Sequence, residues 1–336
     1  MDSDKLGRII SRHGGDYKGP LLIVIGALHG NEVAGVEAIR LMKKMLDVEP
    51  ITNPSFKFQG SFVGLIGNVV AYQSNERYID NDLNRIWTKG KIRKLETADY
   101  QSCEAKEQKK LIKAIKKEIK YYDPTEVIIL DLHTTSSDGG IFTIPTQKKR
   151  SIMVGNALHA PVITGMLADV KGTMLSYYSK KKICGSPITG IVFEAGQHED
   201  PLSINRAIAA ITNCMKVIGN VHSEDVENIH DKLLIAYSKD LPKQSRLLYK
   251  YTIVPNDEFR MRPGYQNFQP IKEFEILADD KNGPVHSPMS GRILMPLYQA
   301  QGSEGFYIIR EESSKNAQNE PLSSSLDTRE APPFLI

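Results

Sequence analysis

The stretch Leu21–Met42, which reads LLIVIGALHGNEVAGVEAIRLM, decides the fold of this chain. Its first part, Leu21–Ile25, is a continuous apolar run that follows a Gly-Pro pair and contains β-branched residues. Such a run is typical of a strand buried on both faces of a sheet. From Gly30 to Leu46 the apolar residues recur at roughly helical spacing, which predicts a helix directly after the strand.

The same alternation of strand and helix continues along the chain. Apolar runs predict further strands at Phe62–Val70, Val127–Leu130 and Gly190–Phe193. One-sided apolar periodicity predicts helices at Glu104–Lys120 and after Pro201. Strands that alternate with helices in this way predict an α/β domain, to which we assign residues 1–240.

The character of the sequence changes near residue 240, where the helical periodicity disappears. Short apolar runs separated by Gly and Pro predict a small all-β domain over residues 241–310. Residues 311–336 are polar and rich in Ser, and we expect them to form a disordered tail. The strands expected in the β domain are Leu247–Val254, Ile276–Ala278, Gly291–Leu297 and Phe306–Arg310.

Composition limits the classes of protein to which this chain can belong. Of its 336 residues 40% are apolar and 25% are charged, which is typical of a globular protein. The net charge of +3 is spread along the chain, so we expect no nucleic-acid partner. The apolar runs are far shorter than the roughly 20 residues that span a bilayer, and no leader pattern is recognised, so we expect no membrane partner. Three widely spaced cysteines favour a reducing, cytoplasmic location, and a homo-oligomer stays open.

His29 and Glu32 are the first candidate functional residues, because they lie where the first strand gives way to its helix. Residues three apart in a tight turn can point at one spot, and an imidazole with a carboxylate suits Zn²⁺. Gly26 and Gly30 permit such a turn at the carboxyl end of a strand, where open α/β sheets bind ligands. An H-x-x-E pair also arises often by chance, so the pair alone is weak evidence for a metal.

His133 is the second candidate, since it follows a predicted buried strand and is expected at the same edge of the sheet. A lone histidine there is more often a satisfied edge or core residue. With His29 and Glu32 it completes two histidines and one glutamate, a set that holds catalytic zinc and leaves one position for water. Either Asp131 or Asp82 could orient a ligand by contacting its second nitrogen, and the sequence does not choose between them.

Glu194 ends the apolar run Gly190–Phe193, so we expect its carboxylate to be partly desolvated. A carboxylate in that position can accept a proton from a water on zinc. A surface glutamate at the end of a strand explains the pattern equally well. Glu199, in the polar loop that follows, is a rival candidate for the base.

The stretch Asn75–Arg85 is mostly polar and has neither helical nor strand periodicity, so it is a loop by default. It brings Arg77, Asn84 and Arg85 close together along the chain. The forked donors of arginine, with an adjacent amide, suit carboxylates and developing oxyanions. These three residues are therefore candidates for binding substrate.

Four of these segments, in this order, resemble the succinylglutamate desuccinylase/aspartoacylase family of the zinc carboxypeptidase superfamily. The resemblance covers about residues 20–220. Its most specific parts are GALHGNE from Gly26 to Glu32, RYIDNDLNR from Arg77 to Arg85, and DLHTT around His133. It implies an α/β fold with the mixed, helix-flanked sheet of zinc carboxypeptidases and a smaller C-terminal all-β domain of the barrel-sandwich kind.

The resemblance also implies a role for each candidate. His29, Glu32 and His133 would bind one Zn²⁺ per chain, and Arg77 would polarise the scissile carbonyl. Asn84 and Arg85 would bind a carboxylate of the amino-acid part of the substrate. Glu194 would be the general base and then the proton donor to the leaving amine.

Two departures from the family leave the natural substrate open. The family has a further substrate-binding arginine ten residues before its general base, and this chain has Cys184 there. Lys180–Lys182 lie close by along the chain and could supply charge with poorer bidentate geometry. Tyr298 is only a loose match to the family's C-terminal substrate tyrosine.

The β domain resembles a biotinyl/lipoyl-type hammerhead, notably over Ser287–Ile293. A carrier domain needs a modifiable lysine at the tip of its hairpin, and Met289-Ser290 provides none. We therefore expect this domain to wall the active site, with the turn Pro288–Gly291 and the segment around Tyr298 nearest the entrance.

The sequence thus predicts a zinc-dependent amidohydrolase that deacylates an N-acyl amino acid, a small-molecule substrate. Two alternatives stay open. The first is a carboxypeptidase-like metallopeptidase that uses the same zinc site. The second is a non-enzymatic binding protein with a vestigial site.

Overall fold

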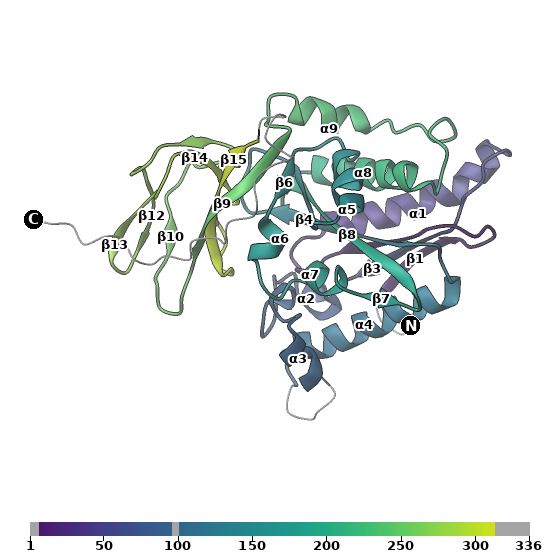
Figure 1. The fold of residues 1–336 in the computed structure, drawn as a ribbon, viewed down its shortest axis with the longest axis horizontal. Coiled ribbons are helices and arrows are strands. Elements are labelled where there is room, and N and C mark those ends of the chain that lie inside the picture. Colours follow the sequence, from purple (N-terminus) through teal and green to yellow (C-terminus); the bar gives the residue numbers. More distant parts are fainter. Residues whose placement is uncertain (1–6, 96–100, 313–336) are drawn as a thin grey trace, which may run out of the picture.

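The structure is a computed structural model that describes residues 7–95 and 101–312 (Figure 1). Its strands are β1 (Ile9–Gly14), β2 (Leu21–Gly26), β3 (Ser61–Ile66), β4 (Val127–Thr135), β5 (Phe142–Pro145), β6 (Val162–Thr164), β7 (Lys182–Ile183), β8 (Ser186–Gln197), β9 (Gln244–Thr252), β10 (Arg260–Met261), β11 (Pro270–Ile271), β12 (Ile276–Asp280), β13 (Gly283–His286), β14 (Gly291–Leu294) and β15 (Glu304–Glu311). Its helices are α1 (Ala34–Thr52), α2 (Val69–Ser74), α3 (Lys89–Lys94), α4 (Cys103–Tyr122), α5 (Lys149–Asn156), α6 (Met166–Asp169), α7 (Met174–Tyr178), α8 (Leu202–Ile218) and α9 (Asp231–Ser238), with a 3₁₀ turn at Leu83–Arg85.

The strands of the first 240 residues form a mixed sheet. Its central strands β3, β2, β4 and β8 are hydrogen-bonded in that order and run parallel to one another. Strand β1 is antiparallel to β3 at one edge, and β5 is antiparallel to β8 on the other side. The predicted α/β fold with a mixed sheet is therefore confirmed.

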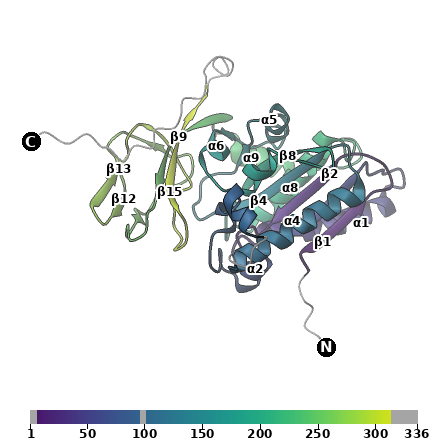
Figure 2. The same ribbon diagram turned by 60° about the horizontal axis from the view of Figure 1, so that its bottom comes forward.

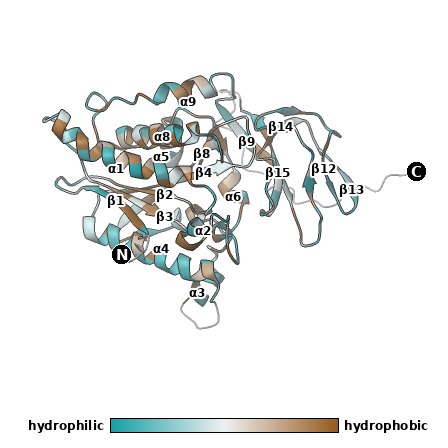
Figure 3. Cartoon of the chain, turned by 180° about the vertical axis from the view of Figure 1, so that it is seen from behind, coloured by the Kyte–Doolittle hydropathy of each residue, from teal (hydrophilic) through white to brown (hydrophobic). Residues whose placement is uncertain are grey.

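Helices cover both faces of this sheet because the central strands are apolar on both sides. Leu21, Ile23 and Ile25 of β2 share one core cluster with the inward face of α4. The alternate residues Leu22 and Val24 share another cluster with α1 and α8. In Figure 2, α4 crosses the near face of the sheet. Figure 3 shows apolar colour along β2 and hydrophilic colour on the exposed side of α4.

Two elements near the N-terminus begin or end at residues other than the predicted ones. Helix α1 starts at Ala34 rather than Gly30, because the chain first makes a turn in which Glu32 N–H donates to the carbonyl of His29. The predicted strand Phe62–Val70 stops at Ile66. It gives way to α2, where the side chain of Asn68 accepts a hydrogen bond from Ala71 N–H and caps the helix.

Two strands extend beyond their predicted ends, and this matters for the site. β4 continues through His133 to Thr135, and β8 continues through Glu194 to Gln197. The two strands are parallel neighbours, and His133 lies opposite Glu194 in their register. Both side chains therefore belong to rigid strands rather than to the loops that follow.

Four of the strands after residue 240 extend the same sheet. β9 pairs in parallel with β6, and β15, β14 and β11 follow in order. Strands β10, β12 and β13 make a second, smaller sheet. The β character of this region is confirmed, although the domain boundaries after residues 240 and 310 stay a prediction. Glu311 still belongs to β15, and the rest of the expected tail, from residue 313, lies outside the described residues.

The buried core supports this continuity between the two regions. Phe268, Leu294, Tyr307 and Ile309 are buried in the cluster that also contains Leu21 of β2. The three cysteines are free thiols. Within residues 7–95 and 101–312, no helix combines the length and apolar character needed to cross a bilayer.

Candidate active site

The candidate residues meet at the carboxyl ends of the parallel strands. His29 and Glu32 lie in the turn between β2 and α1, while His133 and Glu194 come from β4 and β8. The turn approaches other backbone closely, since a Cβ on Gly30 would lie 2.1 Å from the carbonyl carbon of Ala71. A glycine is therefore required at this position of the turn.

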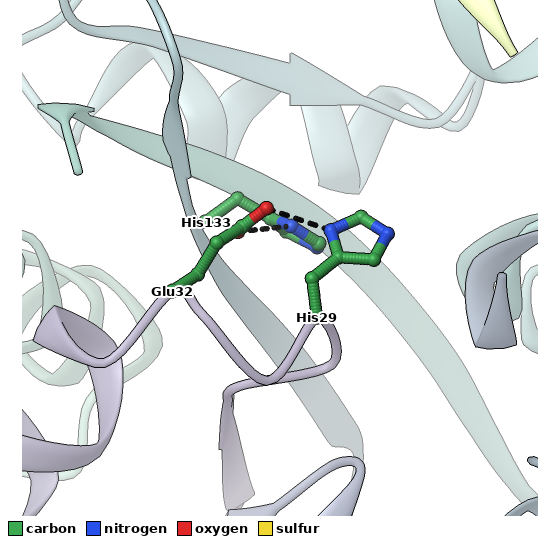
Figure 4. A group of neighbouring side chains, drawn as sticks. All are labelled: His29, Glu32 and His133. Carbon is green, nitrogen blue, oxygen red and sulfur yellow. Dashed lines mark hydrogen bonds and ion pairs between the residues drawn. The ribbon is translucent and has the colours of Figure 1, made fainter. Parts of the chain in front are cut away.

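His29, Glu32 and His133 form one buried cluster (Figure 4). His29 Nδ1 lies 2.7 Å from Glu32 Oε1, and His133 Nδ1 lies 2.9 Å from Glu32 Oε2. One ligand atom from each residue can be chosen so that all three lie within 4.8 Å of one another. Two imidazoles and a carboxylate are the donor set of catalytic zinc sites, so these residues fit a Zn²⁺ ion.

An aspartate contacts the second nitrogen of each histidine. Asp82 Oδ1 lies 3.2 Å from His29 Nε2, and Asp131 Oδ2 lies 3.1 Å from His133 Nε2. Both aspartates that the sequence left as alternatives therefore take part, one for each histidine. The Asp82 contact is a hydrogen bond, whereas Asp131 lies at ion-pair distance from His133 without hydrogen-bond geometry. Both aspartates are on the Nε2 side of the rings, which leaves Nδ1 of each histidine for a metal.

The two carboxylates that contact His29 are held in the ionised form. Burial would raise the pKa of Glu32, but His29 and His133 outweigh it and hold that pKa well below its ordinary value. Burial likewise opposes charge on Asp82, and His29, Arg77 and Arg85 hold its pKa well below the ordinary value. Both groups are therefore carboxylates at neutral pH.

Glu194 is buried beside the cluster. Only 3% of it is exposed, and its Oε2 has no hydrogen-bond partner among the described residues. Burial raises the pKa of Glu194 to about 8, even though His133 works in the opposite direction. A carboxyl group that titrates near neutral pH is suited to accept and return a proton. Glu199, the rival candidate, is exposed and does not line the pocket described below.

Arg77 reaches the same cluster from the loop after α2. Its Nη2 lies 3.1 Å from His29 Nε2 and 3.3 Å from Asp82 Oδ2, and its Nη1 lies 3.4 Å from Glu32 Oε1. Its Nε is buried without a hydrogen-bond partner in the described part of the chain. Arg77 therefore contacts the cluster of His29, Glu32 and His133, and its Nε–H is still available to donate a hydrogen bond to a ligand.

The Arg77 loop is held in place by Glu104, a buried residue of α4 that the sequence analysis did not single out. The Glu104 carboxylate accepts hydrogen bonds from the backbone N–H groups of Ile79, Asp80 and Asn81, at 2.8, 3.0 and 3.0 Å. Three backbone donors on one buried carboxylate fix a loop that has no periodic structure of its own. No local pattern in the sequence marks Glu104 for this role.

Asn84 and Arg85 form the next part of the site. Asn84 Oδ1 accepts a 2.9 Å hydrogen bond from Met174 N–H, which leaves its amide nitrogen as a donor for a ligand. Arg85 is paired with Glu304 of β15, with Nε 3.0 Å from Oε1 and Nη2 2.6 Å from Oε2. Burial opposes the charge of Arg85, but Asp82 and Glu304 outweigh it and raise its pKa. Burial likewise opposes the charge of Glu304, but Arg85 outweighs it and lowers the pKa of Glu304.

Most of these residues line one open pocket, a concave site of the kind that binds small molecules. Beside the polar groups named above, the lining includes an apolar wall formed by Ile144, Met166, Leu167, Val170, Val192 and Leu297.

The segment that precedes β15 covers the pocket by contacting the loops around it. Gln299 accepts a 3.2 Å hydrogen bond from the side chain of Asn31, and the side chain of Gln301 bonds the backbone of Tyr78 in both directions. Tyr298 N–H donates to Ser136 Oγ at 3.0 Å. The C-terminal region therefore contacts the β2–α1 turn, the loop that carries Arg77 and the loop after β4.

Three residues considered from the family pattern lie elsewhere or are already bonded. Lys182 and Cys184 belong to the β7–β8 hairpin at the amino end of β8, and about 3.3 Å per residue puts Cys184 roughly 30 Å along the chain from Glu194. The hydroxyl of Tyr298 donates to the carbonyl of Arg262 and accepts from the N–H of Tyr265. The turn Pro288–Gly291 does not contribute to the described lining of the pocket, whereas Leu297 and Gln299 do.

Comparison with known proteins agrees with this architecture. The model of the succinylglutamate desuccinylase/aspartoacylase catalytic domain matches residues 18–218. A probable aspartoacylase of Prochlorococcus marinus subsp. pastoris is 25% identical over 288 residues, 82% of this chain and 87% of the relative. A probable aspartoacylase of Nostoc sp. is 27% identical over 133 residues, which is 40% of this chain and 38% of the relative.

The solved structure of a succinylglutamate desuccinylase from Vibrio parahaemolyticus has a similar fold. The TM-score is 0.59 at 17% sequence identity, and the match covers 89% of this chain and 83% of the other. The likeness therefore extends through the C-terminal β region as well as the catalytic region.

Proposed function

This chain belongs to the succinylglutamate desuccinylase/aspartoacylase family, and on that premise we propose that it is a zinc-dependent hydrolase of N-acyl amino acids. The observation that carries the proposal is the buried cluster of His29, Glu32 and His133 with Glu194 beside it in a pocket. A zinc ion held there would lower the pKa of a water and polarise the acyl carbonyl.

The residues of the chain supply the other parts of the reaction. Glu194 accepts a proton from the attacking water and returns it to the nitrogen of the leaving amine. Arg77 donates N–H groups to the carbonyl oxygen as negative charge develops on it. Asn84 and Arg85 bind the carboxylate of the amino-acid part and thereby place the amide bond against Glu194. The cover formed by Leu297 and Gln299 favours a small substrate over a long peptide.

The test is a direct one. The full chain is loaded with Zn²⁺, its metal content is measured by mass spectrometry, and release of free amine is followed on a panel of N-acyl amino acids and peptides. We expect one zinc per chain and hydrolysis of N-acyl amino acids. Cleavage confined to C-terminal peptide bonds would favour a carboxypeptidase, and failure to bind zinc would favour a vestigial site.

Asp131→Asn is expected to weaken zinc binding by about 10–100-fold without unfolding the chain, the usual effect of removing a carboxylate that contacts a ligand histidine. Asp131 is buried and lies against His133, so a neutral amide of the same shape removes the charge that supports the ring. Competition with a zinc chelator measures the affinity. Asp138→Asn, an exposed change in the loop after β4, serves as the control, and equal affinities in the two variants would contradict the assignment.

Arg85→Ala is expected to lower kcat/KM on substrates with a free carboxylate by roughly 30-fold or more, because losing one partner of a buried charge pair costs about 2–5 kcal/mol. The same variant also leaves Glu304 unpaired, which affects every substrate. The comparison is therefore made against the matching carboxamides, on which the loss should be clearly smaller. Equal losses on acids and amides would reject a carboxylate-binding role for Arg85.

A further inference from the structure

The cations of the pocket are few, and each already faces a carboxylate. Among the described residues that line it, Arg77 and Arg85 are the only lysines or arginines. Arg77 lies 3.3 Å from Asp82, and Arg85 lies 2.6 Å from Glu304. The lining also contains Glu32 and Glu194. The protein part of the pocket therefore has no surplus of positive charge with which to attract a doubly negative substrate.

Arg85 nevertheless retains room for one carboxylate. A guanidinium has five N–H donors in a planar fork. Nε and Nη2 each donate one to Glu304, and Nη1 donates one to the backbone carbonyl of Asn84. One N–H on Nη1 and one on Nη2 remain as donors for a ligand. They are enough for one carboxylate and not for two.

One side of the pocket, beside Glu194, is a poor place for a second carboxylate. Val192 lies on the same face of β8 as Glu194, and its register partner on β5 is Ile144. Met166 of α6 and Val170, the residue directly after this helix, belong to the same apolar wall of the pocket. All four are at least nine-tenths buried. A carboxylate placed there would lose its hydration without gaining a partner, whereas an apolar group would gain from burial.

We propose that Glu304 makes this pocket selective for N-acyl amino acids that have a single carboxylate and an apolar acyl group or side chain. Glu304 acts as a positioning residue. It accepts hydrogen bonds from Nε and Nη2 of Arg85 and offsets part of the positive charge of the guanidinium. Substrates with more than one carboxylate, such as N-acetylaspartate with two and N-succinylglutamate with three, are thereby disfavoured. The proposal rests on the proposed deacylase function and specifies its substrate class.

The experiment compares four probes on the zinc-loaded full chain. N-acetylmethionine carries an apolar side chain and N-hexanoylglycine an apolar acyl group, whereas N-acetylaspartate and N-succinylglutamate carry extra carboxylates. We expect kcat/KM for the better apolar probe to exceed that for both probes with extra carboxylates by about tenfold or more, because like charges placed together are strongly unfavourable. Which apolar probe is preferred identifies the group that contacts the apolar wall.

Two variants test Glu304 itself, and a third is a control. The readout is the ratio of kcat/KM for the apolar probes to kcat/KM for the probes with extra carboxylates, which a general loss of folding would not change. Glu304→Gln should shift this ratio toward the probes with extra carboxylates by about tenfold or more, because Arg85 then loses one of the two carboxylates, Asp82 and Glu304, that offset its charge. Glu304→Asp, which keeps the charge, should retain the preference for apolar probes. Asp279→Asn removes the partner of Arg262 from a similar two-pronged pair, 2.9 Å in both contacts, outside the pocket, and should leave the ratio unchanged.

The outcomes separate this inference from the proposed function. If the unaltered chain prefers N-acetylaspartate or N-succinylglutamate, the inference is overturned and the deacylase function still stands. An unchanged ratio in Glu304→Gln overturns the role of Glu304. Failure to hydrolyse any N-acyl amino acid overturns the proposed function, and the inference with it.

Discussion

Replacement of His133 by alanine should abolish stoichiometric zinc binding and hydrolytic activity together. Catalytic zinc with two histidines and a glutamate has three protein ligands, and loss of one leaves too few to hold the ion. His133 also lies between Glu32 and Asp131, at 2.9 and 3.1 Å, so its removal leaves two buried carboxylates without their shared partner. His29→Ala should have the same effect on zinc and on activity.

The measurement is zinc per chain after dialysis, by mass spectrometry, with circular dichroism to verify that each variant is folded. The matched control is His159→Ala. His159 is exposed and lies 2.8 Å from Asp231, so it is also a histidine beside an aspartate but far along the chain from the cluster. It should keep full zinc and full activity. A full zinc complement in His133→Ala would sink the assignment of the metal site.

Glu194→Gln is expected to keep its zinc and lose about 10²-fold or more in kcat, the usual contribution of a general base. Glutamine has nearly the same shape but cannot accept the proton of the attacking water. Since Glu194 Oε2 makes no hydrogen bond with the described residues, the change should cost the fold little. Loss of turnover with intact zinc therefore separates the role of Glu194 from that of the ligands.

Turnover at saturating substrate and zinc content are measured on the same preparations. Glu199→Gln is the control, because Glu199 lies in the adjacent loop and is exposed. It should change turnover little. Near-normal turnover in Glu194→Gln would show that another group is the base, and a large loss in Glu199→Gln would point to that residue.

Much of the fold follows from short-range patterns. The apolar run at Leu21–Ile25 could be recognised as a strand because both of its faces are buried, one under α4 and the other under α1 and α8. The predicted helix at Glu104–Lys120 lies within α4, Cys103–Tyr122. The predicted ends were less accurate at Gly30 and Val70, where a turn and the short helix α2 replaced the continuous pattern.

The grouping of His29, Glu32 and His133 could also be predicted from sequence. His29 and Glu32 are neighbours in one turn, and His133 comes from a parallel strand directly beside β2, so their meeting follows from the order of the sheet. The sequence could not choose between Asp82 and Asp131, because their contacts depend on where each histidine ring points. The structure brings one aspartate to each ring.

The sequence by itself thus determined the α/β pattern, the turn that carries His29 and Glu32, and the types of side chain that gather at this edge of the sheet. Only the tertiary structure decided what surrounds them. Glu104 binds the loop after Arg77, and Glu304, which is 219 residues from Arg85 along the chain, takes one edge of its fork. Periodicity and turn residues report interactions over a few positions, whereas these charge pairs arise when distant strands and helices pack. No local pattern distinguishes such glutamates from those on the surface.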